Sequence, residues 1–436
     1  MRLADRLKQH AAARVGPTHA VPAASTAPSG PIAPGPASIG LPALADRLAS
    51  ALGLSSTPAR ATDEAGFDTR ARTLRPGELA TLPASVSLAV PALAEIRAAL
   101  AVVTGQGHVG AGPLAVLDLE TTGLGTVGGT AIPAVVGLTV AETDVVVSQW
   151  VLRHGGAEGR LLRQVATRLS ALAEAGGTLL SFNGGSFDRP LLTARMRRFG
   201  ISAAWPRHFD LLTVARRLWG HEGECRLTAL EWRRLGIVRR GDLSGAAVAD
   251  VLVAALQRPG AAGLRAQVDR VLDHNQVDLL TPLVLLPAMR AAIERPQGAA
   301  QARGVARHLI AQGDDDRARQ VLEQALAACR DLRDLGAQNL ALECATARRR
   351  AGDRAGAAAL WAWVCAEAPG HPVAHEGLAK HLEHRRRDPA AALAVARASS
   401  LPCPQRLARL HRKTSGAAIP AWEHVIGRWA AKSAPV

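Results

Sequence analysis

Two acidic residues stand two positions apart at the end of an apolar run, in the segment LAVLDLETTG at 114–123. Residues i and i+2 of a strand point to the same face, so Asp118 and Glu120 would lie side by side. Two carboxylates on one face repel each other unless a cation lies between them, and their oxygens suit Mg²⁺ or Mn²⁺. On this segment alone, the alternative is a sheet edge at which both acids are solvated.

A third acid follows a predicted buried strand in the segment LLSFNGGSFDRPLL at 179–192. Asp188 opens the next predicted helix, and the two glycines before it would let the backbone pass close to a phosphate-bearing strand. The other interpretation is that Asp188 caps the helix, with Pro190 in its first turn. Both interpretations stay open for this segment.

A histidine and a further acid are four residues apart in LDHNQVDLL at 272–280. His274 and Asp278 would therefore share one face of a helix, so that a general base and a ligand carboxylate can point into one site. A histidine on a helix can also be a surface or capping residue. Asp269 and Asp273 compete with Asp278 for the ligand role, and the apolar residues after Asp278 favour it.

The elements that must position these residues follow an α/β order. Three strands are predicted over LAVLDLE, IPAVVGLTVA and DVVVSQWVL, followed by a helix over EGRLLRQVATRLSALAEAG and a buried strand over TLLSFN. More helices are predicted over RPLLTARMRRFG, LLTVARRLWG, LTALEWRRLG, GAAVADVLVAALQ and LRAQVDRVLDHNQVDLLTPLVLL. This order indicates a mixed sheet flanked by helices.

In this order, LDLETTG, SFNGGSFDRPLL, FDLLTVARRLWG, LTALEWRRLGI and DHNQVDLL resemble the YprB-like branch of the DEDD 3′–5′ exonucleases. That family lies within the ribonuclease-H-like superfamily, and the resemblance runs from about residue 113 to 286. It implies a ribonuclease-H-like α/β fold, and it places Asp118 and Glu120 in the first motif, Asp188 in the second and Asp278 in the third. His274 stands beside the last of these acids as the candidate base.

Four such acids can hold two divalent cations, Mg²⁺ or Mn²⁺, about 3.5 to 4 Å apart, and so hydrolyse a phosphodiester bond. With an ordinary pKa of about 6.5, His274 would take the proton of the attacking water near neutral pH. Two departures from the family stand out. The histidine lies four residues before its Asp, where the His-type enzymes commonly have five, and an Ala/Val-rich run follows RRGDLSG where the family has Pro and aromatics. The second departure puts substrate contacts in doubt more than the metal site.

The chain is strongly basic, with 52 Lys and Arg against 37 Asp and Glu and a formal charge of +15. Such an excess predicts a polyanionic partner, and we expect DNA or RNA, bound at a single-stranded end. Solvated helix faces and a biased genome would give the same excess. The candidate nucleic-acid contacts are Thr121, Asn183, Phe187, Arg195, Arg216 and Arg217.

Four segments follow from composition. Residues 1–60 are a low-complexity segment with short amphipathic helices and a disordered Pro/Ala/Gly/Ser-rich linker, and residues 61–104 are a lead-in. Residues 105–290 are the ribonuclease-H-like domain, and residues 300–436 are all helical. In this last segment Gly313-Asp314, Gly352-Asp353 and Arg387-Asp388 separate pairs of helices at spacings of 39 and 35 residues. The spacing favours a tetratricopeptide-like repeat, with an ordinary helical bundle as the alternative.

Five cysteines without a CxxC motif indicate neither a disulfide framework nor a zinc site. No export signal and no membrane-spanning run is evident, so we expect a cytoplasmic protein without a membrane partner. The favoured function is a metal-dependent nuclease, most specifically a 3′–5′ exonuclease, whose helical repeats bind a protein partner or more nucleic acid. The alternatives are a nucleic-acid-binding protein that does not cleave, a helical-repeat adaptor built on a nuclease fold, and a scaffold.

Overall fold

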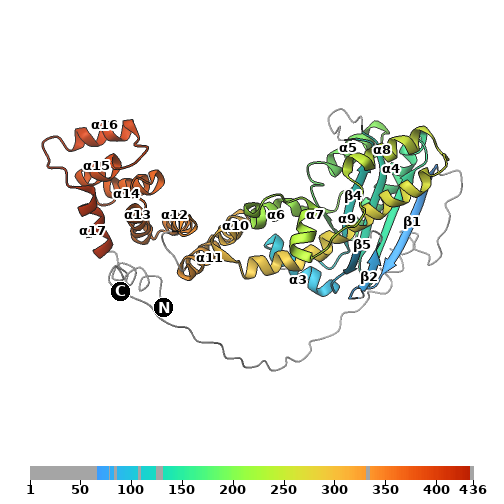
Figure 1. Cartoon of the computed structure of the whole chain (residues 1–436), viewed down its shortest axis with the longest axis horizontal. Coiled ribbons are helices and arrows are strands. Elements are labelled where there is room, and N and C mark those ends of the chain that lie inside the picture. The colour runs from blue at the N-terminus through green and yellow to red at the C-terminus, as the bar shows by residue number, and fades with distance from the viewer. Residues whose placement is uncertain are drawn as a thin grey trace, which may run out of the picture. The chain divides into compact units, whose positions relative to one another are not determined.

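The computed structural model describes residues 66–432, apart from 78, 83–85, 107–109, 124–130 and 330–333. The predicted low-complexity segment 1–60 lies outside the described residues. The described chain divides into two compact units, one that ends at Glu294 and one that begins at Arg295 (Figure 1).

The first unit is built on a six-stranded mixed sheet, which confirms the predicted α/β class. Its central strand β4 pairs antiparallel with β5 and parallel with β7, and β7 pairs parallel with β8. Antiparallel β6 and β1 complete the other side. The strands, in sheet order, are β1 (Phe67–Leu74), β6 (Val145–Leu152), β5 (Pro133–Ala141), β4 (Leu114–Thr121), β7 (Thr178–Ser181) and β8 (Arg207–Asp210).

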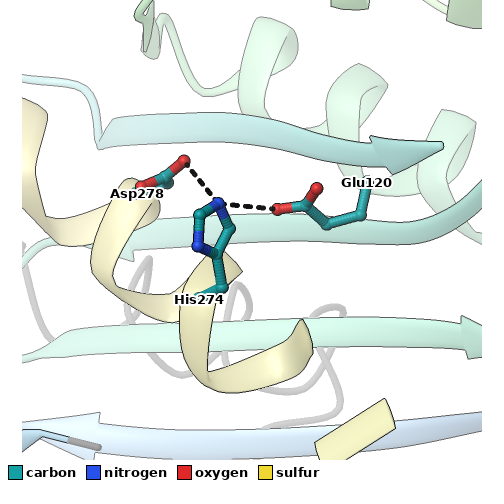
Figure 2. A group of neighbouring side chains, drawn as sticks. All are labelled: Glu120, His274 and Asp278. Atoms are coloured by element: carbon teal, nitrogen blue, oxygen red, sulfur yellow. Dashed lines mark ion pairs between the residues drawn. The ribbon is translucent and has the colours of Figure 1, made fainter. Parts of the chain in front are cut away.

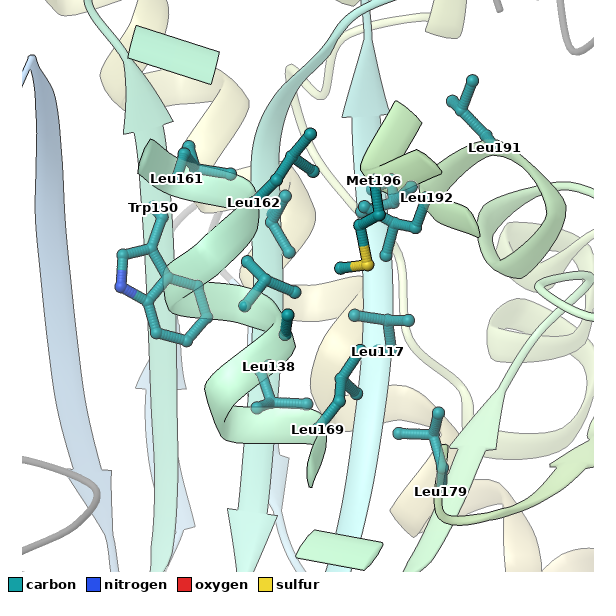
Figure 3. Packing of buried hydrophobic residues seen from close by; sticks show 14 of the residues in the cluster. Leu117, Leu138, Trp150, Leu161, Leu162, Leu169, Leu179, Leu191, Leu192 and Met196 are labelled. Atoms are coloured by element: carbon teal, nitrogen blue, oxygen red, sulfur yellow. The ribbon is translucent and has the colours of Figure 1, made fainter. Parts of the chain in front are cut away.

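One face of the sheet is covered by α4 (Glu158–Glu174) and α5 (Asp188–Arg198). Leu117, Leu138 and Trp150 point from neighbouring strands into this layer and meet leucines of α4 (Figure 3). The central strands are buried on both faces, which explains why β5 is mostly apolar rather than alternating, and why every one of its residues is buried.

The opposite face is covered by α8 (Gly245–Gln257) and the long α9 (Leu264–Glu294), which packs across β4, β5 and β6. Because Leu117 and Leu119 of β4 belong to the α4 side, the alternation of the strand turns Asp118 and Glu120 toward α9. By length and composition α9 alone among the described helices could span a membrane, yet 67% of its apolar window is buried in the unit. It is the core helix of this domain.

The predicted lead-in supplies part of this unit. β1 extends the sheet beside β6, and α3 (Leu93–Thr104) packs on α9. The short strands β2 (Leu79–Leu82) and β3 (Val86–Ala89) form a separate pair. The sequence did not predict β1 or β8, because each is exposed or half-buried and lacks a clear apolar pattern.

Four short elements lie between β8 and α8. They are α6 (Leu211–Trp219), a 3₁₀ turn η4 (Gly220–Glu222), α7 (Leu227–Leu230) and a π-helical turn η5 (Glu231–Leu235). The last of these places Glu231 in the interior, where it is fully buried.

The second unit consists of helices among its described residues, which confirms the helical C-terminal region. The first six helices pack each against the next, α15 packs against α16, and α17 packs against α13 and α15. A relation to tetratricopeptide repeats stays a prediction. The helices are α10 (Gly298–Ala311), α11 (Asp315–Ala328), α12 (Leu335–Arg350), α13 (Arg354–Glu367), α14 (Pro372–His384), α15 (Pro389–Arg397), α16 (Pro404–Lys413) and α17 (Trp422–Lys432).

Gly137 of β5 sets how closely α9 approaches the sheet. A Cβ at this position would lie 2.6 Å from the Leu279 side chain and would overlap that of Asn275. We expect Gly137→Ala to destabilise the unit by about 1 to 3 kcal/mol, because α9 must move away from β5. The matched control is Gly245→Ala in α8, where an added Cβ meets nothing within 4 Å. Urea denaturation monitored by tryptophan fluorescence tests this, and equal midpoints for the two variants would contradict it.

Candidate functional site

Acidic side chains gather where three parallel strands end. The carboxyl ends of β4, β7 and β8 lie at the same edge of the sheet, because these strands run in the same direction. β4 brings Asp118 and Glu120 to this edge, and Asp188 begins α5 just after β7. Asp278 and His274 arrive from α9, which crosses β4.

Glu120, His274 and Asp278 face one another across this edge (Figure 2). His274 Nε2 lies 3.9 Å from Glu120 Oε1 and 3.7 Å from Asp278 Oδ2. Ligand atoms of the three residues all lie within 4.8 Å of one another, a spacing that would allow one ion to contact all three. The structure therefore places three of the five predicted catalytic residues close enough to contact one ion.

Asp118 belongs to the same cluster through its charge. Burial raises the pKa of its carboxyl well above the usual value, and the charges of Asp278, Glu120 and Asp188 raise it further. The hydrogen bond from Asn275 Nδ2 to Asp118 Oδ2, 2.7 Å long, acts in the opposite direction. Asp118 is thus held in place but its charge is not compensated.

The Asn275 amide is fixed by a second partner. Its Oδ1 accepts a 2.8 Å hydrogen bond from Gln149 Nε2, which also donates to the carbonyl of Leu272. Since the oxygen of Asn275 is committed to Gln149, its NH₂ group is directed at Asp118. This chain from β6 through α9 fixes the orientation of the Asp118 carboxylate.

Glu120 and Asp188 carry strongly raised pKa values in the same pocket. Burial and the charges of Asp278 and Asp188 raise the pKa of Glu120 to about 8, against the lowering influence of His274. Burial and the charges of Asp210 and Asp278 raise the pKa of Asp188 to about 8. The neighbouring positive charges do not outweigh burial and repulsion at these carboxyls, and a divalent cation bound by oxygen ligands would.

The loop before Asp188 is shaped by Asp210 rather than by a ligand. Asp210 Oδ1 caps α6 at the amide of Leu212 and accepts from the amide of Asn183, while Oδ2 accepts from Gly185. A Cβ on Gly184 would lie 2.8 Å from Asp188 Oδ2. These contacts make Asp210 the cap of α6, and one glycine makes room for Asp188 itself.

His274 is held by an acid that the sequence did not single out. Its Nδ1 lies 2.7 Å from Asp242 Oδ1. Burial would lower its pKa, but Asp242, Asp278 and Glu120 together raise it to about 9. In the metal-free protein His274 is therefore protonated at pH 7, contrary to the expectation that it titrates near neutrality.

Arg239 supplies a permanent positive charge beside the cluster. Its guanidinium is buried and pairs with Glu231, Asp242 and Asp278. Glu231 also accepts a hydrogen bond from Thr281 of α9. Of the three candidate acids on α9, Asp273 is committed to Arg70 of β1 at 2.7 Å, which leaves Asp278 as the one facing the cluster.

The residues predicted to contact nucleic acid differ in their exposure to solvent. Arg195 is buried and ion-paired to Glu158 of α4, so the prediction that it contacts phosphates is wrong. Thr121 is buried and donates to the carbonyl of Gly123, and Phe187 packs against the core. The exposed candidates are Asn183 and Arg216, with Arg217 half-buried.

Sequence reasoning missed Asn275, Arg239, Glu231 and Asp242. Each acts through a partner far along the chain, so no spacing pattern marks it. The available signal was the turn RRGDLSG, in which Gly241 has a left-handed φ of 68° and brings Arg239 and Asp242 together.

The raised pKa values predict that the metal-free protein loses stability as pH rises. Above about pH 4.5 the unfolded chain has lost protons that folded Glu120 and Asp188 keep up to about pH 8, and folded His274 keeps its proton up to about 9. Folding thus takes up protons, and the unfolding temperature should fall between pH 5 and 9. Asp118→Asn should flatten this slope because it removes one of the repelling charges.

Thermal unfolding in EDTA measures the slope of the unfolding temperature against pH for the wild type and for Asp118→Asn. The control is Asp269→Asn, at an exposed position of α9. Excess Mn²⁺ should raise the unfolding temperature of the wild type and the control more than that of Asp118→Asn. Identical slopes in all three proteins would contradict the assignment of repelling charges to this cluster.

Comparison with known proteins agrees with the observed fold. Residues 115–289 match the model of the RNase_H superfamily. The chain is 32% identical over 220 residues to the uncharacterized protein YprB of Bacillus subtilis (strain 168), a match that covers 48% of this chain and 50% of that protein. The chain thus spans about half the length of that relative. No solved structure gives a significant match.

The matched residues include β4, β5, β6 and β7, all five residues predicted as catalytic, and most of α9. Residues 115–289 of this chain are therefore a ribonuclease-H-like domain, with the acidic cluster at the carboxyl end of its central strand.

Proposed function

We propose that this protein is a metal-dependent nuclease that hydrolyses phosphodiester bonds, and more specifically a 3′–5′ exonuclease. The RNase_H superfamily match supports a nuclease-type hydrolase with a nucleic-acid substrate. The observation that carries the proposal is the convergence of Glu120, His274 and Asp278 with the buried, mutually repelling Asp118 and Asp188. The exonuclease polarity rests on the resemblance of the motifs.

The donor set fits two divalent cations. Four carboxylates offer only hard oxygen ligands, which suits Mg²⁺ and Mn²⁺, and the raised pKa values show that the charge of the cluster is not balanced by protein groups. Asp118, Glu120, Asp188 and Asp278 would hold the ions. When bound, they would activate water and stabilise the leaving oxygen.

His274 would accept the proton of the attacking water at Nε2. Asp242 bonds Nδ1, so it fixes the ring with Nε2 toward Glu120 and Asp278. Asp242 is the largest cause of the raised pKa of His274, followed by the charges of Asp278 and Glu120. Cations on Asp278 and Glu120 would cancel the second part and so lower the pKa of His274 from about 9. Arg239 would hold one oxygen of Asp278 and leave the other for an ion.

The substrate we propose is a single-stranded end of DNA or RNA. Asn183, Arg216 and Arg217 remain candidates for contact with it, and the helical unit remains a candidate for binding a protein partner.

One observation favours a different function. Arg239 is a buried cation already paired with Asp278, so the site contains part of the positive charge that a metal would bring. A protein that binds nucleic acid without cleaving it could use such an internal cation in place of one ion.

Cleavage of 5′-labelled single-stranded DNA and RNA in Mg²⁺ or Mn²⁺ separates these functions. The wild type should give a ladder of progressively shorter labelled products. Asp118→Asn should slow cleavage at least about 100-fold, because it removes a ligand charge, while the control Asp269→Asn should match the wild type.

The same gels show whether the enzyme shortens the strand from its 3′ end, and whether the protein cleaves nucleic acid at all. A discrete internal cut would indicate an endonuclease and would contradict the exonuclease assignment. Salt-sensitive binding without cleavage in either metal would favour the protein that binds without cleaving.

A further inference from the structure

Three hairpins of the helical unit turn through the same backbone conformation. In each, a residue with positive φ precedes an Asp that caps the next helix through its side chain. The residues at the left-handed position are Gly313 (φ 85°), Gly352 (φ 88°) and Arg387 (φ 53°). The caps that follow them are Asp314, Asp353 and Asp388.

Arg387 therefore stands where the other two hairpins have glycine. Left-handed backbone is free for glycine and unfavourable for a residue with a Cβ. Of all described residues other than glycine, only Asn183 and Arg387 have a positive φ. The turn geometry favours glycine at position 387, so backbone conformation gives no reason for an arginine there.

The charge of the neighbouring residues offers a reason for an arginine at position 387. Arg385, Arg386 and Arg387 are all exposed at the end of α14, and none has an acidic partner among the ion pairs of the described residues. The charges of Arg386 and Arg385 add to burial in lowering the pKa of His381. The end of α14 is thus a region of positive potential.

The end of α16 pairs with Glu383 of α14, two residues before Arg385. Arg409 Nη2 lies 2.8 Å from Glu383 of α14, and Lys413 Nζ lies 2.8 Å from the same carboxylate. Arg412 is exposed between them in sequence. The α14–α16 basic cluster comprises Arg385, Arg386, Arg387, Arg409, Arg412 and Lys413.

We propose that the α14–α16 basic cluster binds the sugar–phosphate backbone of a nucleic-acid strand, as a second binding surface apart from the acidic site. Arginine forks match phosphate oxygens, and such binding needs charge rather than apolar anchors. Protein interfaces are centred on large apolar or aromatic side chains, and the cluster itself contains none. The exposed Val373 of α14 and Leu401 before α16 stand outside it as single residues. That the bound polyanion is a nucleic acid rests on the proposed function, whereas the expectation that the cluster binds a polyanion rests on the cluster alone.

The test measures binding in the full chain carrying Asp118→Asn, so that the probe stays intact. Fluorescein-labelled single-stranded DNA and RNA of 30 nucleotides are titrated at several KCl concentrations by fluorescence anisotropy. Arg387→Gly should weaken binding by about 3- to 10-fold and reduce the slope of log K against log salt by about 0.7, the value for one phosphate contact on a single strand. The pair Arg385→Gln and Arg386→Gln should reduce the slope about twice as much.

Arg387→Gly should also raise the unfolding temperature of the helical unit by about 2 °C, because glycine relieves the left-handed backbone. Weaker binding with a more stable fold separates a binding role from a structural one. The control Arg163→Gln removes an exposed charge from α4 of the other unit and should leave affinity and salt slope unchanged.

Two results would overturn the proposal. One is nucleic-acid binding by the cluster variants that equals that of the control. The other is unchanged nucleic-acid binding with weakened binding of a polyglutamate peptide, which would assign the cluster to an acidic protein. Because no step of the assay needs cleavage, a failure of the proposed nuclease activity would leave the expected binding result unchanged.

Discussion

The repulsion among buried carboxylates at the end of β4 is the interaction on which the rest of the site depends. Burial and mutual charge raise the pKa of Asp118, Glu120 and Asp188 together. A folded protein keeps such groups only if they are protonated or if a cation joins them. A bound divalent cation would let this arrangement stay folded with its carboxylates ionised.

The surrounding structure fixes the acids without neutralising all of them. Asn275 holds Asp118 by one hydrogen bond, and Arg239 holds Asp278 by an ion pair. The contact of Asn275 with Asp118 needs α9 close to the sheet, and Gly137 of β5 permits that approach. One small residue on a neighbouring strand thus links packing to the geometry of the candidate metal ligands.

Much of the fold and the acidic residues could be predicted from sequence because they follow local rules. Strand alternation placed Asp118 and Glu120 on one face, and helical spacing placed His274 beside Asp278. The contacts of Asp242 with His274 and of Arg239 with Asp278 could not be predicted, since they join residues 32 and 39 positions apart. The prediction that Arg195 contacts phosphates was wrong for a related reason, because its buried partner Glu158 lies on another helix.

The helical unit shows a further limit of sequence reasoning. Three dipeptides ending in Asp marked the hairpins correctly, and the structure gives each Asp a capping role. Only the backbone angles reveal that Arg387 occupies a position suited to glycine.

The most direct test of the central claim is calorimetric titration of Mn²⁺ into the protein at pH 7, in two buffers of different ionisation enthalpy. If the carboxyls bind the ions, binding must displace their protons, so the apparent enthalpy should differ between buffers by an amount that corresponds to at least about one proton released. Asp118→Asn should bind more weakly and release fewer protons. Binding without proton release, or equal binding by the variant, would contradict the account.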